Sequence, residues 1–169
     1  MSELMLVRHA KSDWHTHKTD FDRPLNKRGS KEALHMGEFL VQQNLVPDLM
    51  VVSAAVRARE TAKQFQVSMS IPEKKIIFDK ELYLADLDTL LEIIGLYAKD
   101  GKRLLVLAHN PGMDELVSYL SEQAPPLTTN GKLMVTCAVA CLQFKSVEEV
   151  ASMGKGALKA LFRPREIFT

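Results

Sequence analysis

The sequence predicts an α/β fold in three layers, with a mostly parallel central sheet and helices on both of its faces. Short apolar runs, such as Leu-Met-Leu-Val at 4–7, alternate with longer segments whose apolar residues recur at helical spacing. Within these runs apolar and polar residues do not alternate, as expected of strands that are buried on both faces of a parallel sheet. Strands that alternate with helices along the chain are typical of α/β domains.

The expected elements follow one another without an internal repeat or a convincing linker. A polar segment at 11–28 follows the first strand, and connections of this length are often functional. The first helix begins at Gly29 and keeps an apolar stripe to about Gln43, and Asp86 is a good N-cap for the third helix. The other expected strands are 49–52, 75–78, 103–108 and 133–144, with a further edge strand in 154–169 that Pro164 disfavours; the other helices cover 55–67, 87–101 and a segment from 112 onward.

Length, charge and hydropathy limit the class of protein. A chain of 169 residues suits one domain, so we expect residues 1–169 to form a single one. The formal net charge of +1 gives no overall attraction to nucleic acid or to an anionic membrane. The apolar runs are far shorter than the ~20 residues that span a bilayer, and the N-terminus lacks a signal-peptide pattern. We therefore expect a cytoplasmic protein that binds neither nucleic acid nor membranes.

Two cysteines, Cys137 and Cys141, lie in the expected strand at 133–144. Residues four apart on a strand share one face at a separation of about 13 Å, which is too far for a disulfide. The sequence supplies no partners that would complete a metal site with them. We therefore predict two small buried thiols and no metal centre.

Cationic and imidazole side chains follow three of the apolar runs. Arg8 and His9 end the first, Arg57 comes shortly after the second, and His109 directly follows the run at 103–108. The carboxyl ends of parallel strands meet at one edge of a sheet, where open α/β sheets place their ligands. Guanidinium groups match the charged oxygens of a phosphoryl group, and a neutral imidazole can attack its phosphorus. The pattern predicts a phosphoryl pocket with His9 as the nucleophile.

These residues lie in three motifs, LVRHA at 6–10, SAAVRARETA at 53–62 and AHNPG at 108–112. In order and spacing they resemble the motifs of the histidine phosphatase superfamily, also called the phosphoglycerate-mutase-like superfamily. The segment DRPL at 22–25 with Gly29, and the segment APPLTT at 124–129, resemble its small SixA-like phosphohistidine phosphatase branch. Ala10 departs from the superfamily, much of which has glycine there, and KSDW at 11–14 replaces the polar residues of many members that act on small molecules.

The resemblance implies a phosphoglycerate-mutase-like fold and a role for each matching residue. His9 becomes transiently phosphorylated and is then released by water, while Arg8, Arg57 and His109 bind the phosphoryl oxygens. Ser53 shapes the turn before the second helix, where its hydroxyl can cap the helix that presents Arg57. No metal or organic cofactor is implied.

The general acid is left open by the sequence. Glu81 is the nearest counterpart of the acid found in the superfamily, and the alternative interpretation is a solvated residue before the third helix. SixA-like members lack a well-placed acid, which the labile P–N bond of phosphohistidine explains. Asp13, Asp20 and Asp22 in the loop after the nucleophile are weaker candidates. Arg23 has two interpretations, as a residue of the pocket rim or as one that holds this loop against acidic neighbours.

Three functions are compatible with these residues, and the first is favoured. It is a phosphatase that forms phosphohistidine on His9 and acts on protein phosphohistidine, through a pocket open enough for bulky substrates. The alternative is a phosphomonoesterase for a small metabolite phosphate, and a third is a phosphate-recognition module without catalysis. A mutase is disfavoured because the chain is short. The sequence identifies neither the partner protein nor the oligomeric state.

Overall fold

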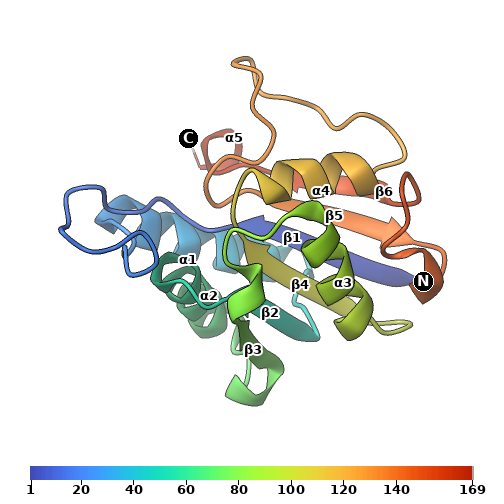
Figure 1. Ribbon diagram of the computed structural model, residues 1–169, viewed down its shortest axis with the longest axis horizontal. Coiled ribbons are helices and arrows are strands. Elements are labelled where there is room, and N and C mark those ends of the chain that lie inside the picture. The colour runs from blue at the N-terminus through green and yellow to red at the C-terminus, as the bar shows by residue number, and fades with distance from the viewer. Residues whose placement is uncertain (169) are drawn as a thin grey trace.

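The structure, a computed structural model, describes residues 1–168 of the chain. Six strands form one sheet in the order β3-β2-β4-β1-β5-β6 (Figure 1). The strands are β1 (Ser2–Arg8), β2 (Leu49–Ser53), β3 (Ile76–Asp79), β4 (Arg103–Ala108), β5 (Val139–Phe144) and β6 (Ala157–Phe162). The helices are α1 (Lys27–Gln42), α2 (Val56–Met69), α3 (Leu87–Tyr97), α4 (Gly112–Leu120) and α5 (Pro164–Ile167).

The sheet is mostly parallel, as predicted. The pairs β1–β4, β4–β2 and β2–β3 are parallel, whereas β5 runs antiparallel to both β1 and β6. In the central pair, Arg8 lies opposite Ala108, so β1 and β4 end at the same level. This register places His9 and His109, the next residue on each strand, beside each other at the carboxyl edge.

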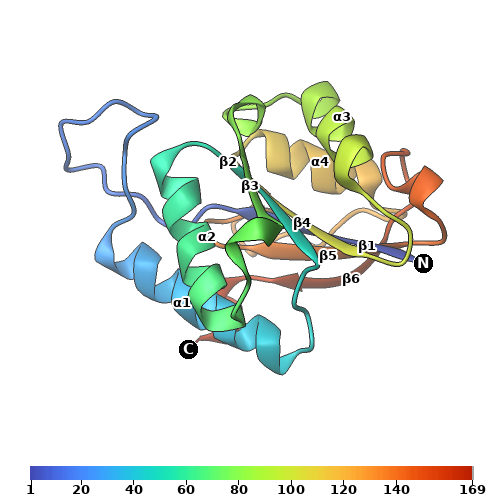
Figure 2. The same ribbon diagram turned by 90° about the horizontal axis from the view of Figure 1, so that it is seen from below.

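Helices cover both faces of the sheet, which confirms the three-layer prediction. Figure 2 shows α1 and α2 on one side of the strands and α3 and α4 on the other. In β1, Leu4 and Leu6 belong to the core under α3 and α4, and Met5 and Val7 belong to the core under α1 and α2. All four side chains are fully buried, which explains why the run has no polar alternation.

The loop after β1 is closed at its base by backbone hydrogen bonds. Asn26 N–H donates to the Lys11 carbonyl (3.0 Å), and Asp13 N–H donates to the Pro24 carbonyl (2.8 Å). The Asn26 side chain also accepts from Gly29 N–H (2.7 Å) and so caps the first turn of α1. The predicted N-cap of α3 is confirmed, because the Asp86 carboxylate accepts from Thr89 N–H (2.9 Å).

The strand expected over 133–144 forms only in the second half of that range. It begins at Val139, and the preceding residues form the end of the segment that projects between α4 and β5 (orange in Figure 1). Cys137 has a left-handed backbone (φ 63°), which breaks the strand, and its N–H donates to the carbonyls of Arg8 and His9. The predicted buried thiols are confirmed at Cys137 and Cys141, but Cys137 lies outside the strand, so the separation expected from strand geometry does not apply.

The C-terminal part of the described chain also differs from the expectation. The disfavoured edge strand forms as β6, because Pro164 falls just after it and occupies the first position of α5, where a missing N–H costs nothing. Helix α5 was not predicted. Between residues 1 and 168, no helix combines the length and the apolar character needed to cross a membrane.

Gly29 is required where α1 passes the loop after β1. A Cβ at this position would lie 2.1 Å from the Lys11 carbonyl oxygen, which the base of the loop holds in place. We therefore expect Gly29→Ala to lower the free energy of unfolding by about 1–3 kcal/mol. Urea denaturation measures the change.

Gly95→Ala is the matched control, because Gly95 lies in α3 with no atom within 4 Å of the added carbon. This variant should be as stable as the parent or gain up to about 1 kcal/mol of helix propensity. Equal stability of both variants would show that the contact between Gly29 and Lys11 is not a tight one.

Candidate active site

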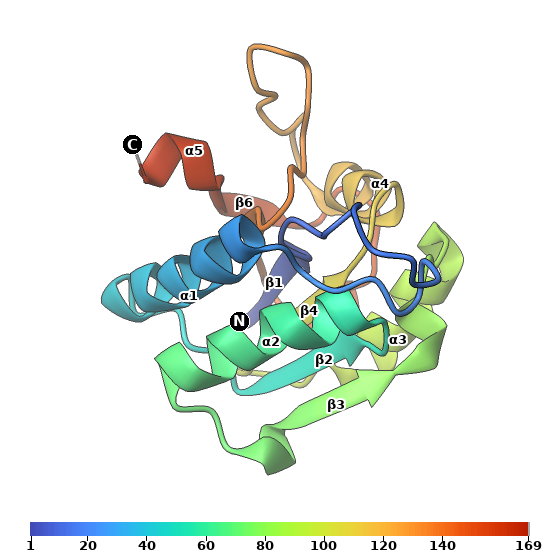
Figure 3. The same ribbon diagram turned by 90° about the vertical axis from the view of Figure 1, so that its left-hand side faces the viewer.

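The site lies at the carboxyl edge of the sheet, where three chain segments meet. His9 follows β1, His109 follows β4, and Arg57 lies in the first turn of α2, which follows β2. Figure 3 views this end of the molecule, with the loop after β1 (dark blue) near the starts of α2 and α4. The register of β1 and β4 brings the two imidazoles to a centroid distance of 5.1 Å, with their planes 52° apart.

His9 is buried and held in one orientation. Its Nδ1 lies 2.7 Å from the Ala10 carbonyl oxygen, which only accepts, so Nδ1 carries the proton. Nε2 then has a free lone pair, which accepts from Arg57 Nε at 3.3 Å. Burial, followed by the charges of nearby groups, lowers the pKa of His9 to about 3. His9 is therefore a neutral imidazole with an available nitrogen over the physiological pH range.

The phosphoryl-binding residues expected from the sequence surround His9. Arg8 Nη1 donates to the Met134 carbonyl (3.0 Å), and His109 Nε2 lies 2.7 Å from Ser53 Oγ. Burial, followed by the charge of Arg57, lowers the pKa of His109 to about 4, so this imidazole is also neutral. Arg8 Nε and His109 Nδ1 are buried and have no hydrogen-bond partner within residues 1–168. Unpaired buried polar groups are costly, and polar groups left unpaired beside a cavity lined by arginine and histidine favour a site that binds a charged ligand.

Ser53 contributes differently from the expectation. It is the last residue of β2, and the N-cap of α2 is Ala55, which makes no side-chain capping bond. The predicted capping role is therefore wrong. Ser53 Oγ does accept from Ala55 N–H (3.3 Å), which shapes the turn, and it also fixes the imidazole of His109.

The Glu-Thr pair of the second motif ties α2 to the loop after β1. Glu60 Oε1 accepts from Leu25 N–H (2.8 Å), and Thr61 Oγ1 accepts from Ala10 N–H (3.0 Å). The Thr61 hydroxyl in turn donates to the Arg57 carbonyl (2.8 Å). These contacts set the distance between His9 and Arg57. The sequence contained the pair as part of a motif but gave no sign of its partners.

The carboxylate that lines the cavity is Asp20, not Glu81. Asp20 accepts from Arg57 Nη2 (3.1 Å), from Arg23 Nη1 (2.6 Å) and from the Tyr83 hydroxyl. The bond from Tyr83, followed by those from the two arginines, lowers the pKa of Asp20, so it is an anion at neutral pH. Glu81 lies in a short turn that buries the next residue and leaves Glu81 exposed, outside the cavity lining.

Arg23 fulfils both interpretations offered by the sequence. It is buried, it lines the cavity, and it holds the loop by donating to Ser12 Oγ (3.0 Å) and to Asp20. Its guanidinium carbon lies 3.7 Å from the ring centroid of Trp14. The importance of Trp14 was not recognised in the sequence, because an aromatic residue in a polar loop has no periodicity that marks its place.

The cavity has a volume of about 220 Å³ and joins the three predicted motifs to the loop after β1. Its mouth lies at the surface, because Trp14, Asp20 and Leu84 line it and are exposed. Within residues 1–168 no three His, Cys, Asp or Glu side chains are grouped as metal ligands. The lining comprises Arg8, His9, Lys11, Ser12, Trp14, Asp20, Arg23, Arg57, Leu84, His109, Asn110 and Thr136.

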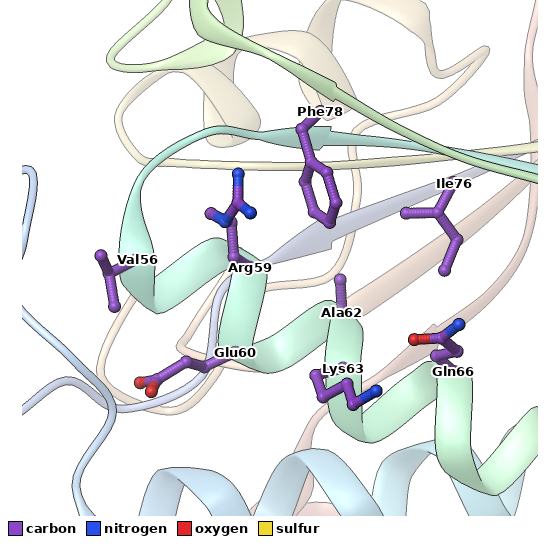
Figure 4. A pocket seen from close by; sticks show the side chains of 8 residues that line it. All are labelled: Val56, Arg59, Glu60, Ala62, Lys63, Gln66, Ile76 and Phe78. Carbon is purple, nitrogen blue, oxygen red and sulfur yellow. The ribbon is translucent and has the colours of Figure 1, made fainter. Parts of the chain in front are cut away.

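A second hollow lies on the other side of α2, against β3 (Figure 4). Side chains of both elements face each other there, and the Arg59 guanidinium carbon lies 4.2 Å from the ring centroid of Phe78. Neither histidine of the site lines this hollow, nor do Arg8 and Arg57. It is therefore separate from the candidate active site.

Comparison with known proteins identifies the family. Residues 4–83, which carry the first two motifs, match the model of the histidine phosphatase superfamily (branch 1). An uncharacterized protein of Mycobacterium tuberculosis is 32% identical over 115 residues, which cover 68% of this chain and 70% of that protein. An uncharacterized chloroplastic protein of Arabidopsis thaliana is 33% identical over 135 residues, or 75% of this chain. The match spans 62% of the plant protein, so less than two thirds of that relative is represented here. The chain belongs to the histidine phosphatase superfamily.

Solved structures show the same fold over nearly all of the chain. The protein histidine phosphatase SixA complexed with tungstate superposes with a TM-score of 0.79 at 20% identity, covering 98% of this chain and 99% of that chain. SixA from Agrobacterium tumefaciens superposes with a TM-score of 0.76 at 24% identity, covering 96% of this chain and 99% of that chain. The predicted phosphoglycerate-mutase-like fold is thereby confirmed.

The lowered pKa values make a direct prediction. The imidazoles of His9 and His109 should remain neutral between pH 8 and pH 5, because burial disfavours their charged forms. Histidine NMR signals, assigned with His9→Gln and His109→Gln, should show two rings that do not titrate in this range. A ring of either residue that titrates near pH 6.5 would contradict the buried geometry.

The same pKa values predict how stability depends on pH. In the unfolded chain these two histidines take up protons as the pH falls through 6.5, but the folded protein takes them up only near pH 4 and pH 3. Their contribution to the free energy of unfolding should therefore decrease as the pH falls from about 7 to about 3. Chemical denaturation of the parent and of His109→Gln across this range measures it.

Proposed function

We propose that the protein is a phosphatase that transfers a phosphoryl group from its substrate to His9 and then to water. The observation that carries this proposal is the pairing of a buried, neutral His9 with Arg57, whose Nε donates to the unprotonated Nε2 of the imidazole at 3.3 Å and must release it when the phosphoryl group binds. A neutral imidazole held beside a cation is suited to attack phosphorus and to hold the resulting phosphoryl group. We also propose that residues 1–169 form one domain of this kind.

In the first step, the lone pair of His9 Nε2 forms a bond to phosphorus. The bond between phosphorus and the leaving atom breaks, its electron pair goes to the leaving atom, and this atom takes up a proton from solvent. Nδ1 keeps its proton and donates it in a hydrogen bond to the Ala10 carbonyl. This bond stabilises the positive charge that develops on the ring. The orientation of His9 therefore limits the reaction to Nε2.

In the second step, water attacks the phosphorus atom on His9. The bond between Nε2 and phosphorus breaks, its electron pair returns to Nε2, and one proton of the water passes to solvent. The products are inorganic phosphate and neutral His9, which is the starting state of the site.

The phosphoryl oxygens require fixed donors during both steps. Arg8 and Arg57 supply guanidinium groups. The ring of His109 is fixed through Nε2, which lies 2.7 Å from Ser53 Oγ, and its Nδ1 donates to a phosphoryl oxygen in the tautomer that is protonated there. Arg57 Nη2 donates to Asp20 in the structure, so a phosphoryl oxygen that binds there competes with this carboxylate. The donors are buried and already oriented, which favours electrostatic stabilisation of the transition state.

Protein phosphohistidine is the substrate class that the site supports best. The cavity contains a carboxylate, Asp20, but its lowered pKa makes it a poor proton donor at neutral pH. Glu81, the acid suggested by the sequence, is exposed and lies outside the lining. A P–N bond to imidazole has a good leaving group and needs less protonation than an alkoxide. The likeness to a protein histidine phosphatase, SixA, and the surface position of the cavity mouth support the same class.

The test is phosphate release from a protein phosphorylated on histidine, measured beside small phosphomonoesters. We expect turnover of the phosphoprotein and a loss of at least about 1,000-fold in His9→Ala, since the nucleophile is removed. His17→Ala is the matched control, because this exposed histidine of the same loop does not line the cavity. It should keep the parent activity.

The alternatives make different predictions in the same assay. Preference for one small ester would retain the His9 mechanism and assign a metabolite phosphate as substrate. Binding of the phosphoprotein without phosphate release would indicate a recognition module. Activity that survives in His9→Ala would overturn the mechanism.

A further inference from the structure

Trp14 is the most exposed large side chain at the mouth of the phosphoryl cavity. Its exposed fraction is 66%, although it lines the same cavity as His9 and Arg57. Most of the indole surface therefore remains in contact with water at the entrance of a charged cavity. Exposed aromatic rings at such positions commonly bind ligands.

The indole packs on the guanidinium of Arg23. The guanidinium carbon of Arg23 lies 3.7 Å from the ring centroid of Trp14, and the guanidinium is itself fixed by bonds to Ser12 and Asp20. Trp14 also follows directly on the closed base of the loop, where Asp13 bonds to Pro24. Because Arg23 is buried, the ring is oriented before a substrate binds, which reduces the entropy cost of binding.

Leu84 is a second apolar residue of the cavity lining. Its side chain is 56% exposed, and its backbone is left-handed (φ 51°), a conformation that costs a branched residue free energy. Strained residues of this kind concentrate at functional sites. Trp14 and Leu84 thus add apolar surface to a cavity whose inner part is formed by arginine and histidine.

We propose that Trp14, together with Leu84, binds the aromatic ring that carries the phosphoryl group, so that the protein selects ring-bearing phosphates over alkyl or unsubstituted ones. The inference rests on the proposed function and adds a specificity determinant to it. While the phosphoryl group contacts Arg8, Arg57 and His109, the ring to which it is bonded lies outside them and packs on the indole. The imidazole of phosphohistidine and the phenyl ring of an aryl phosphate share the chemistry that this surface recognises.

The kinetic test uses two pairs of substrates. The members of each pair share the type of bond to phosphorus, P–N in one pair and P–O in the other, and differ in whether they carry a ring. Free phosphohistidine carries the ring and phosphoramidate lacks it, and phenyl phosphate and ethyl phosphate form a second pair. We expect Trp14→Ala to lower kcat/KM for the ring-bearing member of each pair about 5- to 10-fold, mainly through KM. In Trp14→Ala, kcat/KM for phosphoramidate and for ethyl phosphate should change less than about 2-fold. Trp14→Phe should retain most of the preference for the ring.

Phe78→Ala is the matched control for these variants. Phe78 is also an exposed aromatic ring covered by an arginine, but it lies in the separate hollow against α2. Phe78→Ala should leave kcat/KM for all four substrates unchanged. An equal loss for all four substrates in Trp14→Ala would show a structural role for the indole, and no loss would show no role; either result overturns the inference.

A binding measurement separates this inference from the proposed function. Trp14 is the single tryptophan of the chain, so its fluorescence reports on the mouth of the cavity. Phenylphosphonate, which is not hydrolysed, should change the emission at concentrations at least about 5-fold lower than methylphosphonate does. If both phosphonates changed the emission at the same concentration, the inference would be overturned even if the enzyme hydrolyses phosphohistidine. Absence of turnover with every substrate would instead overturn the proposed function.

Discussion

The parallel pairing of β1 with β4 is the constraint on which the site depends. Because Arg8 lies opposite Ala108, the next residue of each strand leaves the sheet at the same level, and His9 N–H donates to the Ala108 carbonyl (3.2 Å). The two imidazoles therefore lie side by side without any contribution from a flexible loop. A shift of the register by one residue would turn one of them to the opposite face of the sheet.

The buried cations and imidazoles form an anion site at a cost to the fold. Burial lowers the pKa of Arg8 and of both histidines, which shows that each charged form is disfavoured here. In the free protein the Asp20 carboxylate partly balances Arg57 and Arg23, while Arg8 Nε and His109 Nδ1 find no partner among residues 1–168. A bound phosphoryl group would supply the missing acceptors, so the same feature that costs stability favours binding of the substrate and of its transition state.

The sequence predicted the residues that are fixed by the ends of strands, but it ranked Asp20, which is placed by long-range contacts, below Glu81. His9 and His109 follow buried apolar runs directly, so the chain order alone puts them at the carboxyl edge. Asp20 reaches the site from the middle of a loop, by bonding to Arg57 on α2, and no local pattern encodes such a contact. The break at Cys137 depends on the carbonyls of Arg8 and His9 at the end of β1, which accept from its N–H, and for that reason the expected strand began too early.

The central claim is that the reaction passes through a phosphoryl group on Nε2 of His9. The most direct measurement is rapid acid-free quenching of the enzyme mixed with a histidine-phosphorylated protein, followed by ³¹P NMR and peptide mapping of the denatured enzyme. We predict phosphate on His9 at Nε2, because Nδ1 is held by the Ala10 carbonyl. Phosphate at Nδ1, on His109 or on another side chain, or steady turnover without any phosphorylated enzyme, would contradict the account.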